Sequence, residues 1–193
     1  AERLDGVLAV LYLIYNEGYT ASAGVDLQRP DLAVEAIRLT RLLAALLPEP
    51  EARALLALML LQHARAGARV DRAGDLVPLE DQDRTRWHAA EIAEGLALLQ
   101  SPADAVGPYR VQAQIQAQHA RARDAADTDW AAILALYRQL PDTPFIELNR
   151  AIAIGMAIGP EAGLGALASL AASGALAGHH LLAAAQADLC RRC

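Results

Sequence analysis

The stretch PEARALLALMLLQHARA, residues 50–66, decides the fold class. Its apolar residues are almost all alanine and leucine, which lose little side-chain entropy in a helix. Leu55, Leu56 and Leu58 would point in different directions around a helix axis, as would the leucines that follow. A helix that is apolar on most of its circumference has to be enclosed by other elements. We therefore predict a central, buried helix over 50–66.

The rest of the chain has a similar character. Of its 193 residues, 54% are hydrophobic but only 4% are aromatic, so alanine and leucine supply most of the apolar surface. No stretch alternates apolar and polar residues for long enough to indicate a sheet. A chain of this length buries a core without disulfides or metal ions. The predicted fold class is all-α: a helical bundle followed by antiparallel helix pairs like those of tetratricopeptide (TPR) repeats, an α-α superhelix.

Glycine, proline and acidic residues mark the expected helix ends. Gly18 is expected in the left-handed conformation that ends a first helix. Asp31 is expected to accept the free amide hydrogens that begin the second helix, and Asp81 or Asp83 those of the fourth. The expected helices cover, in order, 4–16, 31–46, 50–66, a stretch from the acidic cap at 81 or 83 to about 99, 108–123, 128–140, 143–158, 160–172 and 176–190.

The pattern changes near residue 126, after which short helices are joined by tight turns. Trp130, Ile133 and Tyr137 match the W-x2-L-x3-Y spacing of a TPR first helix. We therefore predict an N-terminal helical subdomain over 1–125 and a TPR-like subdomain over 126–193.

Charge argues against direct nucleic-acid binding by this chain. The net charge is −6, and arginines are interleaved with acidic residues. A domain that grips a phosphate backbone usually shows a basic stripe instead. The sequence shows no signal peptide and no apolar run long enough to span a bilayer, so we expect no membrane contact and a cytoplasmic location. The chain has no initiating Met and enters a helix at once, and we expect it to be a piece of a longer protein.

No arrangement of residues indicates an enzyme. Cys190 and Cys193 form a C-x-x-C pair that could be redox active or bind zinc, but a second ligand pair is missing, and we interpret them as incidental thiols of a reducing compartment. His88 and Glu91 could share a metal ion on one helical face, but the sequence lacks the second Glu-x-x-His copy that such a site needs. We predict no catalytic residue, no metal site and no cofactor.

Three polar clusters and one polar pair are candidate interaction residues. They are Tyr15, Asn16, Glu17 and Tyr19; Asp81, Asp83, Arg84 and Trp87; Asp127, Asp129 and Trp130; and Asn149 with Arg150. Helix capping explains acidic residues in the second and third clusters, yet one capping residue suffices for each helix. Surplus carboxylates beside a tryptophan could instead recognise an arginine-bearing partner. Arg150 could pair with an aspartate of the 127–129 turn.

These stretches resemble the C-terminal extension of a subgroup of extracytoplasmic-function (ECF) sigma factors. The segment VLAVLYLIYNEGY, residues 7–19, is similar to the segment just after the promoter-reading domain in that subgroup. Further motifs of the extension occur in the same order: LEDQDR at 79–84, GPY at 107–109, DTDW at 127–130, ELNRA at 147–151 and GPEAG at 159–163.

The resemblance implies a helical, TPR-like extension that modulates transcription initiation by its own sigma factor. The implied partners are the sigma-factor domains in cis, RNA polymerase, or both. The alternative is a small-molecule sensor with a ligand groove between its two halves, lined by Tyr15, Tyr19, Trp87 or Trp130. A third possibility, a helical hydrolase or di-metal enzyme, requires bound metal.

Overall fold

The computed structural model describes residues 2–19, 29–100 and 106–193. These residues form nine α-helices and, apart from one isolated bridge between Val70 and Leu76, no extended pairing, which confirms the all-α class. The chain divides into two compact units, unit 1 (Ala1–Thr128) and unit 2 (Asp129–Cys193). None of the described helices is long and apolar enough to cross a membrane.

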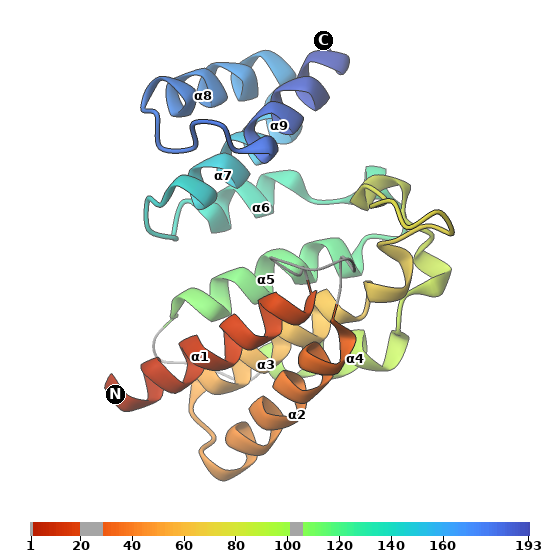
Figure 1. Ribbon diagram of the computed structural model, residues 1–193, viewed down its shortest axis with the longest axis vertical. Helices are drawn as coiled ribbons and strands as arrows, with labels where there is room; N and C mark the ends of the chain where they lie inside the picture. Colours follow the sequence, from red (N-terminus) through yellow and green to blue (C-terminus); the bar gives the residue numbers. More distant parts are fainter. Residues whose placement is uncertain (1, 20–28, 101–105) are drawn as a thin grey trace. The chain divides into compact units, whose positions relative to one another are not determined.

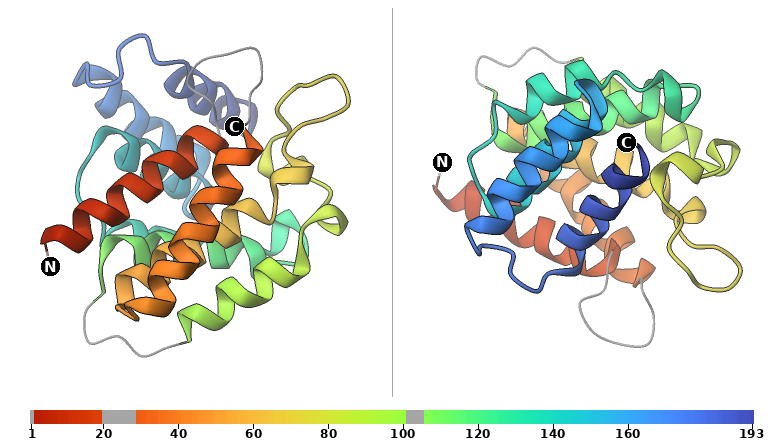
Figure 2. Two further views of the ribbon diagram at one scale, coloured as in Figure 1. Left: turned by 60° about the horizontal axis from the view of Figure 1, so that its bottom comes forward. Right: turned by 90° about the horizontal axis from the view of Figure 1, so that it is seen from above.

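Unit 1 is built around α3 (Pro50–His63), which packs against the other four α-helices described in the unit (Figures 1 and 2). These four are α1 (Glu2–Tyr19), α2 (Pro30–Leu46), α4 (Ala89–Leu99) and α5 (Pro108–Arg121). Every residue from Ala54 to Leu61 is buried, because neighbouring helices cover α3 on all sides. The predicted central helix is therefore confirmed, although it ends at His63 rather than near residue 66.

Short 3-10 turns follow α3 and α5. They are η1 (Ala66–Ala68), η2 (Leu79–Asp81), η3 (Arg84–Arg86) and η4 (Ala125–Asp127). The connection from α3 to α4 folds back on itself, and the amide of His88 donates to the carbonyl of Ala64 at 2.8 Å. This hydrogen bond brings Trp87 to the C-terminal end of α3.

Unit 2 consists of four shorter helices in the order of the chain. They are α6 (Trp130–Tyr137), α7 (Pro144–Ala157), α8 (Pro160–Ala172) and α9 (His180–Arg191). Each packs against the next, and α9 also contacts α7 (Figure 1). Proline stands at the start of α7 and α8, as it does in α2, α3 and α5, because its fixed φ suits the first helical turn and its missing N–H is not needed there.

The predicted end of the first helix is wrong. Gly18 lies inside α1, which continues to Tyr19, and its φ is not positive. The absence of a side chain serves a different purpose, since a Cβ at Gly18 would lie 2.3 Å from the backbone nitrogen of Ala33. Glycine at this position lets α1 and α2 approach closely.

Two predicted helix caps are also wrong. Asp31 lies in the first turn of α2, and Arg29, at the N-cap, makes no side-chain cap bond. Asp83 caps η3 rather than α4, accepting from the amide of Thr85 at 3.0 Å. The N-cap of α4 is His88, which likewise makes no side-chain cap bond.

Candidate functional site

Arginine and aromatic side chains gather where the C-terminal ends of α1, α3 and α5 meet η3. We call this set the arginine–aromatic cluster, and its members are Tyr15, Tyr19, Arg65, Arg69, Arg84, Trp87 and His119. The apolar run of α3 ends at Leu61, four residues before Arg65. The long aliphatic stems of such arginines can lie along apolar surface while the guanidinium groups extend outward.

Arg69 fixes the C-terminal end of α1. Its guanidinium carbon lies 3.8 Å from the centroid of the Tyr19 ring, and its Nη1 donates to the Tyr19 carbonyl at 2.7 Å. The Tyr19 ring in turn stacks on Tyr15 at 5.5 Å, with 18° between the ring planes. A cation over an aromatic face is attracted by the ring quadrupole, and its charge also suits a helix C-terminus.

Trp87 lies between two further guanidinium groups and the end of α5. The guanidinium carbons of Arg84 and Arg65 are 4.4 Å and 5.9 Å from its ring centroid. Arg84 Nη1 also donates to the carbonyls of His119 at 2.7 Å and Ala122 at 2.9 Å. Arg84 therefore satisfies the last carbonyls of α5, which have no partner within the helix.

Burial and mutual repulsion act on the charges of the cluster. Burial lowers the pKa of Arg69, and the nearby Arg65 lowers it further. Burial lowers the pKa of His119 to about 4, with Arg65 and Arg84 contributing in the same direction. Both effects disfavour the charged form, so His119 is neutral at pH 7 while the arginines remain charged.

Several polar atoms around the cluster are buried without a hydrogen-bond partner. They are the Tyr19 hydroxyl, Gln62 Oε1, Arg65 Nε and Trp87 Nε1. Three of the four are donors. An unpaired buried donor costs free energy, and such an atom in a native fold indicates a missing partner or a functional role.

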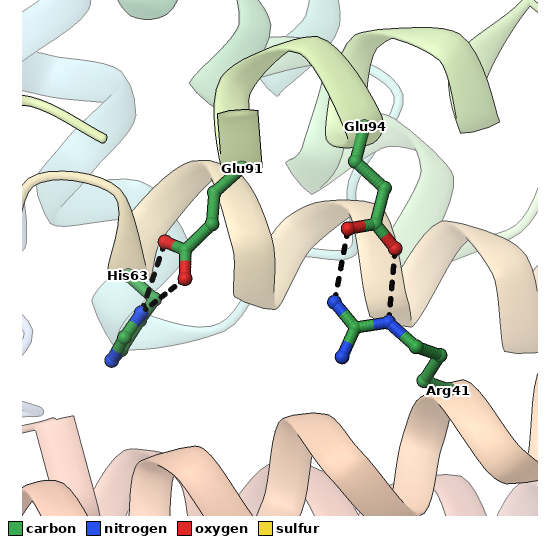
Figure 3. A network of polar contacts seen from close by, with 4 residues as sticks. All are labelled: Arg41, His63, Glu91 and Glu94. Atoms are coloured by element: carbon green, nitrogen blue, oxygen red, sulfur yellow. Dashed lines mark hydrogen bonds and ion pairs between the residues drawn. The ribbon is translucent and has the colours of Figure 1, made fainter. Parts of the chain in front are cut away.

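A second polar arrangement ties α4 to the bundle (Figure 3). Glu91 points from α4 toward His63 of α3, and its Oε1 lies 3.0 Å from His63 Nδ1. Glu94 points toward Arg41 of α2, and its Oε2 lies 2.9 Å from Arg41 Nη2. Glu91 thus contacts His63, not the His88 that the sequence paired with it. Within the described residues, no three histidine, cysteine or acidic side chains are grouped so as to hold a metal ion.

The structure separates the members of the first predicted polar cluster. Tyr15 is 0% exposed, and its hydroxyl donates to the carbonyl of Met59 at 3.2 Å, so its side chain offers no surface to a partner. Asn16 and Glu17 are both half-buried. Tyr19 belongs to the arginine–aromatic cluster.

The second predicted cluster is divided in a similar way. Arg84 and Trp87 join the arginine–aromatic cluster. Asp81 is exposed at the end of η2, and Asp83 is engaged in its turn with Thr85.

The acidic residues of the third cluster act locally on the backbone. Asp127 accepts from the amide of Asp124 at 3.4 Å, and Asp129 caps α6 by accepting from the amide of Ala132 at 2.9 Å. Trp130 is half-buried at the start of α6.

The predicted partner of Arg150 is corrected by the structure. Arg150 Nη2 donates to Asp142 at 2.6 Å, so the connection between α6 and α7 supplies the carboxylate, and not the 127–129 turn. Its neighbour Asn149 is exposed on α7.

Sequence reasoning missed Arg65, Arg69 and His119. Arg65 and Arg69 did carry a signal, because they stand four residues apart shortly after the apolar run that ends at Leu61. His119 carried none, since its neighbours come from distant parts of the chain.

The outer face of α1 carries an exposed apolar stripe. Val7, Val10 and Leu13 are 47%, 55% and 67% exposed, and they recur every three residues along the helix. The opposite face of α1 buries Leu8 and Leu11 in the core. Helix α1 is therefore apolar on both faces, although only one of them is covered.

Comparison with known proteins places the chain in a family. Residues 3–103, more than half of the chain, match DUF6596, a family of unknown function. The chain belongs to the DUF6596 family. The family match takes in α1 with its apolar stripe, and Arg65, Arg69 and Trp87 of the cluster.

The chain is also similar to an uncharacterised protein of Rhizobium meliloti (strain 1021). The two are 48% identical over 170 residues, which is 85% of this DUF6596 chain. The chain spans only 40% of the length of that relative. No solved structure matches this chain.

Proposed function

We propose that this chain is a regulatory interaction domain of an ECF sigma factor and modulates transcription initiation. In this proposal α1 docks on the sigma-factor domains of the same polypeptide, and RNA polymerase is a further contact. The observation that carries the proposal is the exposed stripe of Val7, Val10 and Leu13.

The stripe is suited to a protein partner because of its chemistry and regularity. Three large aliphatic side chains at helical spacing form a continuous apolar face, and such faces on soluble proteins mark interaction sites. Burying them removes apolar surface from water at about 25 cal/mol for each Å².

The choice of sigma-factor domains as the partner has two supports. Residues 7–19, which contain the stripe, resemble the segment that directly follows the promoter-reading domain in ECF sigma factors of this kind. Domains of the DUF6596 family are often found with sigma factors, and the relative from Rhizobium meliloti is much longer than the matched region.

Replacing Leu13 with Asp tests the proposal. The charge would lie in the docked face, so we expect at least about tenfold weaker capture of the sigma-factor domains in a pull-down and a matching loss of regulation in transcription assays. Because Leu13 is exposed, thermal unfolding of the chain itself should barely change.

The matched control is Ile158→Asp. Ile158 is 66% exposed and lies in unit 2, so the substitution adds the same charge away from the stripe. Equal capture by wild type, L13D and I158D would reject docking through α1.

A second candidate function is small-molecule sensing. The observation that favours it is the set of unpaired buried donors in the arginine–aromatic cluster. This cluster lies wholly within unit 1, whereas Trp130, which the sequence also assigned to a ligand groove, belongs to unit 2.

A further inference from the structure

We propose that Gly6 lets the backbone of a partner α-helix approach α1 closely, beside the exposed apolar stripe. The inference rests on the proposed function and names the kind of element that docks, an α-helix of the sigma-factor domains of the same polypeptide. Gly6 is then a specificity-determining residue of the docking face, because a side chain at this position would occupy the space of the partner helix.

Gly6 lies at the centre of the outer face of α1. Successive residues of a helix are about 100° apart, so Gly6, Val10 and Leu13 fall within about 60° of one another around its axis. Gly6 is exposed, and no atom of the described residues lies within 4 Å of the position that its Cβ would take. The described part of unit 1 therefore has no packing need for glycine here, although glycine weakens a helix relative to alanine.

The other glycines within the described α-helices show what such a residue does in this fold. At four of them an added Cβ would lie 2.3–2.8 Å from an atom of another α-helix. They are Gly18 against α2, Gly95 against α3, Gly155 against α9 and Gly163 against α7. Gly6 and Gly165 are the two exceptions in these helices. A glycine inside a helix of this chain therefore marks, in most cases, the close approach of another helix.

The two exceptions differ in their surroundings. Gly6 stands beside Val10 and Leu13, which are 55% and 67% exposed. Among the described residues, none of the exposed large apolar side chains belongs to α8, which carries Gly165. Since an exposed apolar face indicates a protein partner, we expect an approaching helix at Gly6 and not at Gly165.

The outer face of α1 also has the surface relief that helix packing requires. Val7, Val10 and Leu13 form a row of large side chains at a spacing of three residues, and Gly6 and Ala9 form an exposed row of small ones beside it. Two helices pack by placing rows of side chains of one between the rows of the other. A row of partner side chains therefore fits over Gly6 and Ala9 while its flank covers the aliphatic stripe.

The partner helix is assigned to the same polypeptide for two reasons. The chain spans 40% of the length of its relative from Rhizobium meliloti, so that relative has room for further helices. In addition, α1 contains the segment that resembles the one directly after the promoter-reading domain of ECF sigma factors. A second copy of this chain is the competing occupant, and self-association of the chain distinguishes the two.

Gly6→Ala tests the close approach, because its effects on stability and on binding have opposite signs. Alanine is the better helix former, so the chain alone should unfold at a higher temperature than wild type. The added methyl group overpacks the contact, so the dissociation constant for the sigma-factor domains should rise about tenfold. Gly6→Leu places a larger side chain there and should raise it on the order of a hundredfold.

Gly165→Ala is the matched control. It makes the same substitution at an exposed helical position where an added Cβ also meets nothing within 4 Å in the described residues. This variant should likewise unfold at a higher temperature, but it should bind the sigma-factor domains as tightly as wild type does. A second variant of the docking face, Ala9→Leu, should weaken binding as Gly6→Leu does.

The inference is overturned if both Gly6 variants bind the sigma-factor domains as tightly as wild type while Leu13→Asp does not. Docking through α1 would then stand without a close helix approach. Equal binding by all of these variants, Leu13→Asp included, would reject the proposed function and the inference with it. A dimer of the chain alone that Gly6→Leu dissociates, seen by sedimentation, would give the face to a second copy and also overturn the assignment.

Discussion

The two units bury their cores in different ways. Unit 1 encloses α3 with alanines and with larger side chains such as Leu8, Tyr15 and Ile37, and tyrosine, arginine and histidine groups form the arginine–aromatic cluster beside that core. The buried cluster of unit 2 contains only leucine and alanine, and its helices approach closely at Gly155 and Gly163. Unit 1 also has a close backbone approach, at Gly18, but it differs from unit 2 in keeping ionisable and aromatic polar groups inside its fold.

This difference predicts separate sensitivities. Buried ionisable groups make the stability of a fold depend on pH, while close backbone packing makes it sensitive to a single added methyl group. Each unit contains one tryptophan, Trp87 in unit 1 and Trp130 in unit 2, so the unfolding of each can be followed separately by fluorescence.

The largest expected effect is acid destabilisation of unit 1 through His119. Its pKa is about 4 in the fold, because of burial first and Arg65 and Arg84 second, against an ordinary value of 6.5. As the pH falls from about 6.5 to about 4, the unfolded chain takes up the proton first, so the stability of the fold decreases. The loss should be on the order of 3 kcal/mol, measured by urea unfolding at pH 7 and pH 4 with Trp87 as the reporter.

His119→Gln supplies the comparison, because this variant lacks the titrating group. Its stability should fall less between the two pH values than that of wild type. His88→Gln, at an exposed histidine of the same unit, should keep the wild-type pH dependence. The same pH dependence in all three proteins would remove His119 from the explanation.

The next effect concerns the close packing of unit 2. A Cβ at Gly163 would lie 2.7 Å from the Cα of Gly155 and 2.7 Å from Leu189 Cδ1. Backbone atoms of α7 cannot move aside cheaply, so Gly163→Ala should destabilise unit 2 by about 1–3 kcal/mol. Urea unfolding of the Trp87→Phe background, followed through Trp130, measures this change.

Gly165→Ala is the matched control on the same helix. Nothing lies within 4 Å of the position of its added Cβ. Since alanine is the better helix former, this variant should gain up to about 1 kcal/mol. Equal and small effects at Gly163 and Gly165 would show that unit 2 tolerates a wider helix spacing.

Local signals in the sequence predicted much of the fold. The apolar run at 54–61 gave α3, and prolines gave the starts of α3, α5, α7 and α8 to within a residue or two. Caps were harder to assign, because several acidic residues compete near one helix start. Asp83 accepts from the amide of Thr85 and so caps the 3-10 turn η3. A turn this short has no hydrophobic periodicity, so the sequence alone does not indicate that Asp83 caps it rather than α4.

The arginine–aromatic cluster could be predicted only in part, because its contacts join distant residues. Tyr19 and Arg69 are 50 residues apart, and Arg84 and His119 are 35 apart. Tyr19, Arg84 and Trp87 attracted notice as polar or aromatic residues near helix ends. Which arginines these residues contact depends on how α1 and α5 pack on α3. No local sequence pattern predicts that packing.

The smallest effect tests whether the two units unfold separately, and it involves Asp129, the first residue of unit 2. Its carboxylate accepts from the amide of Ala132, so Asp129→Ala should cost about 1 kcal/mol of stability in α6. If the units are independent, Trp130 reports this loss and Trp87 does not.

Asn149→Ala, at an exposed residue of α7, is the control and should change the stability by less than about 0.5 kcal/mol. If the proposed function holds, a transcription defect of Asp129→Ala in the full-length protein with unfolding unchanged would instead identify Asp129 as a contact residue, because a lost cap would destabilise its helix.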